Sequence, residues 1–529
     1  MKLRNHSHGI AEVNLASVND LSDEPQSFDE ARNRPDWPLF LEAIKAELQS
    51  HTENNTWVVV APEQYCNIVG SRLLFKIKRD GEGNILKYKA RIVAQGYSQQ
   101  PGVDFDLTYA PVVSSNALRT LLAYAVHRHM RVEQMDVNVA FLNSTLSEKI
   151  FMSPPSGIKI EQGKVLLLKK ALYGLRQSGR CWFDTLGTFL KSIGFKPLNH
   201  EPCIFTNGVV FIAVYVDDLL LASTCHEALL LAKSQLSARF KMDDLGPARF
   251  CLGLNLNFEA DRLHISQQHY AEKLLRDFGM ADCTPVSTPA DPAVKLVADD
   301  GISKPFVNKV LYQQLAGSLQ YLQGSSRPDI TLATAQISHW NNNPTTAHWT
   351  AALRILRYIK GTTSLGITYT RSETFEPHGY SDADHAGDIG TRRSTSGSIF
   401  MIADGPVIWS SHRQRCVSLS TFEAEYVSLS EAARKGIWLA NLVAELKNAP
   451  VTAMFTILCD NQAAVTQAIG ESNGKMAKHI DIRYRYVKEL VDNKAILVKW
   501  CPSESMVADI FTKPLARPIF ESLRNIIIQ

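Results

Sequence analysis

The sequence is poor in paired cysteines, in long apolar runs and in excess charge of one sign. Its 9 cysteines are scattered, and no two are spaced as Cys-x-x-Cys, which argues against a zinc ribbon or a disulfide framework and for a reducing compartment. Two aspartates interrupt the apolar stretch 208–222, and the N-terminus lacks the apolar core of a signal peptide. The net charge is only +3, so any surface that binds nucleic acid must be local. We expect a soluble intracellular protein.

Length and hydrophobic content favour several packed domains. With 529 residues and 45% hydrophobic residues, the chain can bury large cores, and its length predicts roughly three domains. Residues 1–30 are polar and are typical of a flexible leader. Residues 242–247 predict a turn, residues 250–258 alternate as one strand, and the stretch 282–300, rich in proline and acids, predicts a linker.

Two adjacent acids, Asp217 and Asp218, stand between apolar runs of strand length at 209–214 and 219–221. This pattern predicts a hairpin with both acids at its tip. A fold keeps neighbouring anions together at low cost only where water or a cation neutralises them. Asp136 ends another predicted strand. Three carboxylates on rigid backbone could hold the two divalent ions that phosphoryl transfer between nucleotides requires. Taken alone, a solvated turn for Asp217 and Asp218 and a cap or turn role for Asp136 are the more common interpretations.

A basic hairpin is predicted over residues 74–93, with the turn residues at 80–84 between its strands. Alternation assigns basic residues to one face, namely Lys87, Lys89 and Arg91. It assigns the other face to Leu86, Tyr88, Ala90 and Ile92. The basic face could be merely solvated, or it could grip an anionic backbone or a triphosphate. The same two interpretations apply to a predicted helix at 349–360, on which basic residues are spaced three apart: Arg354, Arg357 and Lys360.

A second group of acids occurs in the last third of the chain, where strands alternate with helices and predict an α/β domain. Its members stand at the ends of predicted strands or early in predicted helices: Asp382, Asp384, Glu423, Glu425, Asp460 and Asp509. Ser420 and Glu423 have the spacing of a capping box, so a helix should begin there. On that helix the two glutamates point about 200° apart, so only one can face a common site. Each acid alone is more often an ordinary surface residue.

The order of several motifs resembles that of copia-type retrotransposon reverse transcriptases. In the first part of the chain these motifs are Tyr88-Lys-Ala-Arg-Ile-Val-Ala-Gln-Gly, Tyr109-Ala-Pro-Val-Val, Gln134-Met-Asp-Val, Ala171-Leu-Tyr-Gly-Leu and Tyr215-Val-Asp-Asp. Later motifs resemble the RNase H domain of the same family: Tyr380-Ser-Asp-Ala-Asp, Glu423-Ala-Glu-Tyr, Cys459-Asp-Asn-Gln and Ala508-Asp-Ile-Phe-Thr-Lys-Pro. The chain departs from the family's usual residues at Gly179, His385, Phe422 and Arg485, none of them a carboxylate.

The resemblance implies roles for particular residues. The polymerase carboxylates, which would also bind metal, are Asp136, Asp217 and Asp218. The residues near the incoming nucleotide are Lys89 and Arg91 at the triphosphate, Phe141 at the sugar 2′-position, and Tyr173 and Gly174. The RNase H carboxylates, again metal ligands, are Asp382, Glu425, Asp460 and Asp509, with Asp384 and Glu423 as neighbours outside the ligand set. Each site is expected to use two Mg²⁺ ions, with Mn²⁺ as an alternative.

The fold class implied is an α+β right-hand polymerase of fingers, palm and thumb, followed by a connection region and an α/β RNase H-like domain. The expected division is a leader (1–30), fingers and palm (31–245), thumb and linker (246–300), connection (301–375) and RNase H-like domain (376–529). The implied activities are DNA synthesis from dNTPs on an RNA template with a DNA primer, and cleavage of RNA in RNA–DNA hybrids. We expect no membrane partner, a cytoplasmic location in a virus-like particle with access to the nucleus, and origin as a piece of a longer polyprotein.

Two other hypotheses remain open at this stage. One is a catalytically silent remnant that only binds nucleic acid, through the basic hairpin and the basic helix face. The other is a host-adopted interaction protein, for which the sequence has no distinctive feature. The 7 carboxylates implied by the resemblance are all present in the sequence, which speaks against inactivation at the level of sequence.

Overall fold

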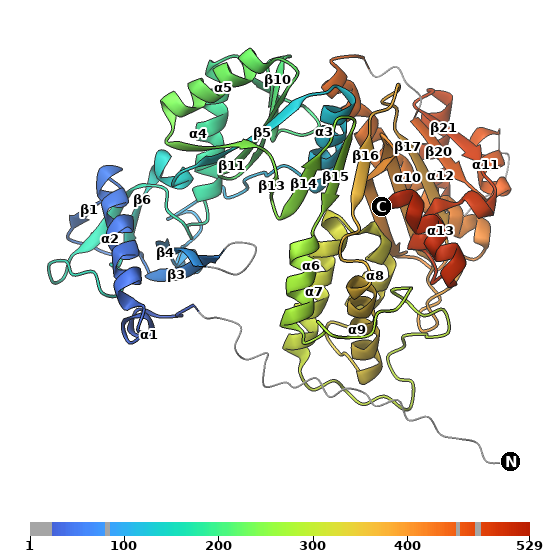
Figure 1. The fold of residues 1–529 in the computed structure, drawn as a ribbon, viewed down its shortest axis with the longest axis horizontal. Helices are drawn as coiled ribbons and strands as arrows, with labels where there is room; N and C mark the ends of the chain where they lie inside the picture. Colours follow the sequence, from blue (N-terminus) through green and yellow to red (C-terminus); the bar gives the residue numbers. More distant parts are fainter. Residues whose placement is uncertain (1–23, 80–84, 451–454, 471–477) are drawn as a thin grey trace.

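The computed structural model describes residues 24–79, 85–450, 455–470 and 478–529. Most of the expected leader and the expected hairpin turn at 80–84 lie outside these residues. Figure 1 shows the chain passing from an α/β part around α2 and β3, through the sheet that contains β5 and β11, to a group of helices and a second large sheet. No helix among the described residues is both long and apolar enough to cross a membrane.

The N-terminal part packs one long helix against two small sheets. Its elements are α1 (Phe28–Arg32), α2 (Trp37–Glu53), β1 (Trp57–Val60), β2 (Ile68–Val69), β3 (Ser71–Arg79), β4 (Ile85–Ala94), β6 (Thr145–Met152) and β7 (Val165–Lys170). One sheet has the order β1-β7-β6-β2, and β3 and β4 form the predicted hairpin. Ala90 and Ile92 are buried as the alternation predicts, but Leu86 is 67% exposed because the strands leave the core toward their turn. The hairpin therefore presents its basic face away from the core.

The central sheet has six strands in the order β12-β5-β11-β10-β9-β8. Their bounds are β5 (Arg131–Val137), β8 (Lys196–Pro197), β9 (Ile204–Thr206), β10 (Val210–Tyr215), β11 (Asp218–Ser223) and β12 (Met242–Pro247). Apolar residues of α4 (Ser178–Ser192) and α5 (His226–Arg239) share a core with one face of this sheet. Residues of α3 (Ser115–His127) share a core with the other face. This helix-covered antiparallel sheet is the expected palm.

Two local predictions around this sheet were wrong. Residues 242–247, expected as a turn, form strand β12, which pairs with β5 through a bulge between Asp244 and Gly246. An edge strand tolerates the acids, Gly and Pro that signal a turn in the sequence. Residues 250–258, expected as one strand, form β13 (Phe250–Cys251) and β14 (Leu254–Phe258). Leu252 and Gly253 both have positive φ, which turns the chain between β13 and β14.

The next part joins a small sheet to a group of helices. The sheet β13-β14-β15-β16 contains β15 (Arg262–Ser266) and β16 (Ile367–Thr370). The helices are α6 (Gln268–Asp277), α7 (Lys309–Ser325), η4 (Pro328–Ile330), α8 (Thr331–Ser338) and α9 (Thr346–Lys360). Two cations of the basic stripe on α9 hold the expected linker: Arg354 lies 3.2 Å from Asp291, and Arg357 donates to the Thr284 carbonyl at 2.8 Å. These contacts favour a structural role for the stripe over contact with a template.

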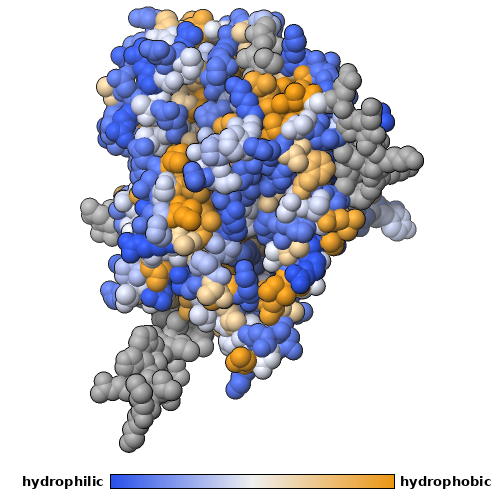
Figure 2. All heavy atoms as spheres, turned by 90° about the vertical axis from the view of Figure 1, so that its right-hand side faces the viewer, coloured by the Kyte–Doolittle hydropathy of each residue, from blue (hydrophilic) through white to orange (hydrophobic). Residues whose placement is uncertain are grey.

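The C-terminal sheet has the order β19-β18-β17-β20-β21, with β17, β20 and β21 parallel and β17, β18 and β19 antiparallel. Its strands are β17 (His378–Ala383), β18 (Thr395–Ile402), β19 (Gly405–Arg413), β20 (Phe455–Cys459) and β21 (Ile496–Trp500). The helices are α10 (Thr421–Lys447), α11 (Gln462–Ile469), α12 (Lys478–Asp492), η5 (Ser503–Ser505), η6 (Val507–Phe511) and α13 (Arg517–Ile527). This mixed sheet with helices is the predicted α/β domain. On the face drawn in Figure 2, apolar side chains form separate groups among hydrophilic ones.

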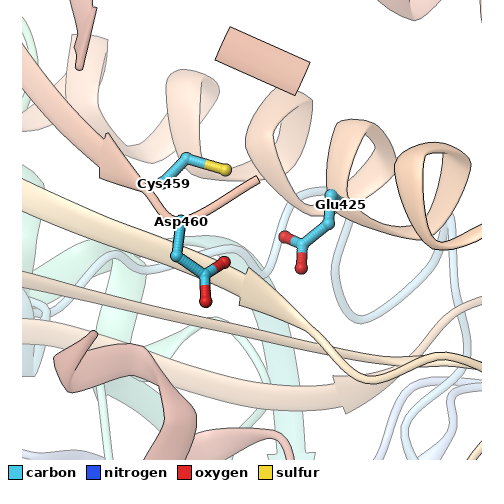
Figure 3. A group of neighbouring side chains, drawn as sticks. All are labelled: Glu425, Cys459 and Asp460. Carbon is cyan, nitrogen blue, oxygen red and sulfur yellow. The ribbon is translucent and has the colours of Figure 1, made fainter. Parts of the chain in front are cut away.

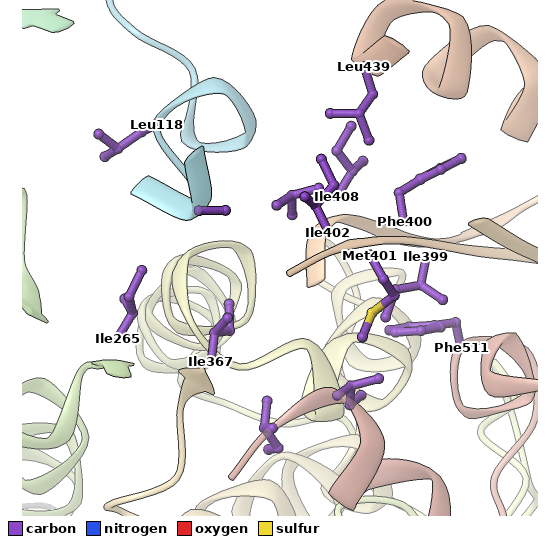
Figure 4. Close-up of a cluster of buried hydrophobic side chains, with 14 of the residues drawn as sticks. Leu118, Ile265, Ile367, Ile399, Phe400, Met401, Ile402, Ile408, Leu439 and Phe511 are labelled. Atoms are coloured by element: carbon purple, nitrogen blue, oxygen red, sulfur yellow. The ribbon is translucent and has the colours of Figure 1, made fainter. Parts of the chain in front are cut away.

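One continuous core joins the palm, the helical part and the C-terminal sheet. Figure 4 shows Leu118 of α3 on one side of this cluster and Ile408 and Leu439 on the other. Arg119 of α3 is buried, its guanidinium lies 3.9 Å from the ring centroid of Trp409, and it donates to the carbonyls of Val407 and Gly324. A buried cation that satisfies carbonyls of two other elements holds those elements in one geometry.

A buried ion pair between Arg327 and Asp329, at the start of η4, gives a stability prediction. Arg327 and Asp329 lie 2.7 Å apart with side chains only 1% and 0% exposed, and Tyr358 donates to the same carboxylate. Asp329→Asn removes the charge that compensates Arg327, so we expect a loss of about 3–5 kcal/mol in the free energy of unfolding. Urea denaturation measures the loss. Glu42→Gln serves as the control, because the Glu42–Lys45 pair is 70% and 62% exposed and should contribute little. Equal stabilities of the two variants would contradict the prediction.

Candidate active sites

Three acids meet at the end of the central sheet. Asp136 of β5 is paired in register with Asp218 of β11, and Asp217 occupies the turn between β10 and β11. The backbone N–H of Val137 donates to the Asp217 carbonyl at 2.9 Å, which ties the turn to β5. The predicted acidic hairpin is confirmed, and strand pairing brings the predicted third acid next to it.

The turn of this hairpin is strained. Val216 has φ of 55°, a conformation that β-branched residues rarely adopt. The indole N–H of Trp182 donates to the Val216 carbonyl at 2.6 Å, and the Val216 side chain packs against the palm core. Such strain persists only where surrounding contacts overdetermine it, and it concentrates at functional sites. The turn is therefore held in one shape by α4.

The charges of these acids are poorly compensated by the protein alone. Burial, and then the charges of Asp217 and Asp218, raise the pKa of Asp136 to about 6. Burial also raises the pKa of Asp218, against the effect of the Gln134 amide, which donates to its carboxylate at 3.1 Å. A divalent cation would supply the missing positive charge, and carboxylate oxygens are the ligands that Mg²⁺ prefers. The residues present therefore fit a divalent metal.

The basic hairpin reaches these acids. Burial and the nearby cations Arg91 and Lys78 lower the pKa of Lys89, while the charge of Asp136 acts in the opposite direction. The guanidinium of Arg91 lies 4.5 Å from the centroid of the Tyr173 ring, and the Tyr173 hydroxyl lies 3.5 Å from an Asp217 oxygen. Lys78 was not among the predicted residues. The alternation of its own strand, which places it beside Lys87 in the register, is the signal that could have found it.

Aromatic packing and one glycine complete this neighbourhood. The rings of Phe141 and Tyr173 meet edge to face with centroids 4.5 Å apart. Gly174 has φ of 91°, and a Cβ there would lie 2.1 Å from the Ala94 carbonyl oxygen, so only glycine fits. The Ala94 N–H donates to the Tyr173 carbonyl at 2.8 Å. The structure thus gathers all five predicted nucleotide-site residues near the palm acids. Their roles remain predictions.

The second predicted site lies at the ends of β17 and β20. Asp382 of β17, Glu425 of α10 and Asp509 of η6 are 3%, 6% and 7% exposed, and Asp460 directly follows β20. Figure 3 shows Glu425 reaching from α10 toward Asp460. Within the described parts of the chain, one group of three potential metal-ligating atoms lies within 4.8 Å of one another: a carboxylate oxygen from each of Glu425 and Asp460, and Sγ of Cys459. Cys459 was not among the predicted ligands. Its position in the sequence next to Asp460 is the signal that could have identified it.

Burial dominates the electrostatics of the second site. Burial and the charge of Asp509 raise the pKa of Asp382, while the Thr512 hydroxyl, which donates to the Asp382 carboxylate, acts in the opposite direction. Burial, and then the charges of Asp382 and Asp460, raise the pKa of Glu425 to about 10. Oε2 of Glu425 is buried without a hydrogen-bond partner. Lys513 Nζ lies 2.8 Å from Oδ1 of Asp509 but outside hydrogen-bond geometry. These buried acceptor oxygens also fit a divalent cation.

Two nearby acids face other partners. Glu423 accepts from the Leu419 N–H at 2.7 Å, while its own N–H donates to the Ser420 hydroxyl at 3.2 Å. Ser420 caps α10 as predicted, while the Glu423 carboxylate accepts from the residue before the cap and not in the capping-box pattern; this leaves Glu425 as the glutamate that faces the other acids. The carboxylate of Asp384 accepts from the backbone N–H of Thr395. Both carboxylates therefore have local partners, consistent with the expectation that neither is a metal ligand.

A helix-covered antiparallel palm sheet with three acids at its end is the arrangement of a reverse transcriptase, and in this chain a mixed α/β sheet with four acids follows it. The family model described as "Reverse transcriptase (RNA-dependent DNA polymerase)" matches residues 54–292. The chain belongs to this family and is of the copia-type Pol polyprotein kind. The matched range contains the palm acids and ends before the second set.

Curated relatives support the same assignment. The chain is 34% identical to the Retrovirus-related Pol polyprotein from transposon TNT 1-94 of Nicotiana tabacum, over 95% of this chain and 39% of that protein. It is 36% identical to the corresponding protein from transposon RE1 of Arabidopsis thaliana, over 91% of this chain and 33% of that protein. A putative transposon Ty5-1 protein of Saccharomyces cerevisiae is 31% identical over 56% of this chain and 98% of its own length. The chain thus spans roughly a third of the longer relatives, 39% and 33% in these two cases.

Among solved structures, the chain is similar to a foamy viral protease-reverse transcriptase in complex with dsDNA. The TM-score is 0.48 and the identity 12%, over 88% of this chain and 83% of that one. The same viral protein in complex with an RNA/DNA hybrid gives a TM-score of 0.47 and 11% identity, over 87% of this chain and 53% of that one.

Proposed function

We propose that this chain is an RNA-directed DNA polymerase that adds dNTPs to a DNA primer on an RNA template. The observation that carries the proposal is the pairing of Asp136 with Asp218 beside Asp217, with the cationic face of the β3–β4 hairpin turned toward them. A solvated acidic turn with no function would not require a third acid and a cationic hairpin beside it. Three acids opposite Lys89 and Arg91 can hold cations on one side of a triphosphate and bind its oxygens from the other.

The residues of the chain have separate tasks in this scheme. Two Mg²⁺ ions, when bound by the palm carboxylates, would stabilise the attacking and leaving oxygens of the phosphoryl transfer. Lys89 and Arg91 bind the triphosphate, and Arg91 is oriented for this by its packing on the Tyr173 ring. Phe141, packed against Tyr173, lies beneath the sugar and excludes a 2′-hydroxyl. Trp182 keeps the acidic turn in place.

We propose in addition that the second site cleaves RNA in RNA–DNA hybrids. Its support is the gathering of Asp382, Glu425, Asp460 and Asp509 at one edge of the C-terminal sheet, where Oε2 of Glu425 is buried without a hydrogen-bond partner. The four acids would hold two divalent ions, and the bound metal would activate water for attack on the RNA phosphate. Thr512 and Lys513 orient the acids Asp382 and Asp509 that they contact.

Primer extension tests the polymerase directly. The purified chain, Mg²⁺, dTTP and oligo(dT) annealed to poly(rA) should give extended primer, and removal of Mg²⁺ with EDTA should stop extension. A folded protein that binds the hybrid without extending the primer would instead indicate the nucleic-acid-binding remnant. Failure to bind the hybrid would point to the host-adopted interaction protein.

The position of Phe141 predicts sugar selectivity. Phe141→Ala removes the ring that packs at 4.5 Å on Tyr173, so a 2′-hydroxyl gains space and the preference for dNTPs over rNTPs should fall at least about tenfold. Single-nucleotide insertion kinetics with dTTP and UTP give the ratio of kcat/KM values. Phe141→Tyr retains the ring and should keep the preference. An unchanged ratio in Phe141→Ala would show that another group screens the sugar.

A further inference from the structure

A thiol stands among the carboxylates of the second site. Cys459 is fully buried at the end of β20, and its Sγ and the nearest carboxylate oxygens of Glu425 and Asp460 all lie within 4.8 Å of one another. In Figure 3 the three side chains come from the end of β20, the residue that follows it and the facing turn of α10. Two carboxylates and one thiol form a donor set different from the oxygens that Mg²⁺ requires.

The spacing suits one small cation. Zinc lies about 2.3 Å from thiolate sulfur and about 2.0–2.2 Å from carboxylate oxygen, so the ligand atoms of one tetrahedral ion are about 3.4–3.6 Å apart. The ligand atoms of Glu425, Cys459 and Asp460 lie within 4.8 Å of one another, so binding would draw them together by up to about 1.4 Å through side-chain rotation. The fourth tetrahedral position would remain open to water.

An independent feature points to a ligand at the same place. Glu425 is 6% exposed, and its Oε2 is buried with no hydrogen-bond partner. A buried acceptor left unsatisfied costs free energy that a bound cation would recover. Glu425 is also one of the three grouped residues, so the unpaired oxygen lies on a carboxylate that belongs to the same donor set as the thiol.

The second cysteine of this region provides an internal comparison. Cys501 follows β21, and its N–H donates to the Cys459 carbonyl at 3.0 Å. Its side chain, however, packs with Met506 and Leu458. Leu458 and Cys459 are adjacent in a strand and point to opposite faces, so the two thiols lie on opposite sides of the sheet. Of these two thiols, Cys459 belongs to the group of ligand atoms within 4.8 Å, whereas Cys501 is close enough only for the charges of Asp460, Asp382 and Asp509 to add to burial in raising its pKa.

We propose that Glu425, Cys459 and Asp460 bind a thiophilic divalent cation, Zn²⁺, at the second site. On binding, the thiol S–H bond breaks, a sulfur–zinc bond forms and the proton passes to solvent, with no change of oxidation state. Thiolate selects zinc over magnesium, because a soft ligand contributes little to a hard ion. As Zn²⁺ would occupy two of the acids assigned to hybrid cleavage, it acts as an inhibitor of that proposed activity.

Cadmium absorbance tests the site without any substrate. Cd²⁺ titrated into the full chain gives an ultraviolet charge-transfer band for each thiolate that it binds, and Zn²⁺ should bleach the band by displacement. We expect Cys459→Ser to lose a tight-binding component of this band and Cys501→Ser to retain it. Asp460→Asn, which keeps the thiol, should weaken the same component at least about tenfold. Circular dichroism verifies that each variant is folded. Identical titrations of the wild type, Cys459→Ser and Asp460→Asn would overturn the proposal.

Hybrid cleavage gives a second readout, and this one rests on the proposed nuclease function. At fixed Mg²⁺, added Zn²⁺ should inhibit the wild type and Cys501→Ser at similar concentrations. Cys459→Ser should need at least about tenfold more Zn²⁺ for the same fractional inhibition. If no protein cleaves the hybrid, the nuclease proposal fails while the cadmium titration still decides the metal site. Equal inhibition of all three proteins would refute the inhibitory role of Cys459.

Discussion

Asp217→Asn is expected to lower primer extension at least about a thousandfold while the second site continues to cleave RNA–DNA hybrids. Asn keeps the shape of the side chain but removes the charge that would hold a divalent ion, and a metal contributes several kcal/mol to stabilising the transition state of phosphoryl transfer. The fold should be retained, because the Asp217 backbone still accepts from Val137 and the turn is still anchored through Val216 and Trp182. Steady-state extension on poly(rA)/oligo(dT) measures the loss.

Asp243 supplies a matched control on the same sheet. It lies on β12, directly opposite Asp136 on the side away from Asp218, and it accepts from the Asn138 amide at 3.0 Å. Asp243→Asn removes the same charge at the same register level but outside the proposed ligand set. Its extension rate should stay within about twofold of the wild type, as expected for an exposed surface substitution. If Asp243→Asn were as inactive as Asp217→Asn, net charge at this end of the sheet, rather than ligation, would be responsible.

Local sequence patterns predicted the parts of the palm site that neighbouring residues determine. The alternation of 85–94 and the apolar runs around Asp217 are properties of single hairpins, and both hairpins occur in the structure. The meeting of Asp136 with Asp218 is not local. It depends on β5 pairing with β11, which the motif order of a known family indicated but which no spacing in the chain could establish.

The errors had the opposite cause, since tertiary contacts outweighed local signals. Residues 242–247 carry turn residues yet form an edge strand, because β5 offers an unpaired edge along which they can lie. The basic helix face of Arg354 and Arg357 was open to two interpretations. The packing of residues 282–300 along α9 indicates a third role, because both cations hold that segment. The pairing of β3 with β4 places Lys78 beside Lys87, close enough for its charge to act on Asp136.

The contact between palm and C-terminal sheet was equally invisible in sequence. Arg119 and Trp409 are almost three hundred positions apart, and neither belongs to a motif that suggested an interaction. Yet the buried guanidinium binds carbonyls on β19 and on α7. A shared core with a satisfied buried cation resists relative motion of the parts that it joins. The two candidate sites are therefore carried by one packed body.

Glu425→Gln is expected to abolish hybrid cleavage, lowering it at least about a hundredfold, and to leave primer extension at wild-type rates. The amide keeps the volume of a side chain that is 6% exposed, but it cannot supply the anionic oxygen that a divalent ion requires. Burial and two neighbouring acids raise the pKa of Glu425 to about 10, so near pH 7 the metal-free side chain is already neutral, the amide hardly changes its charge, and stability should not fall. Cleavage of an end-labelled RNA annealed to DNA gives the rate.

The matched control for this variant is two residues away. Glu423 binds the Leu419 N–H at the start of α10, so Glu423→Gln should cost at most about 1 kcal/mol of stability and preserve cleavage. The pair separates ligation from helix capping, because both variants exchange a carboxyl for an amide of similar volume on the same helix. Loss of cleavage in Glu423→Gln with retention in Glu425→Gln would reverse the assignment. Since the helical offset between the two side chains allows only one of them to face Asp460, loss in both would mean that α10 itself, rather than one carboxylate, determines the activity.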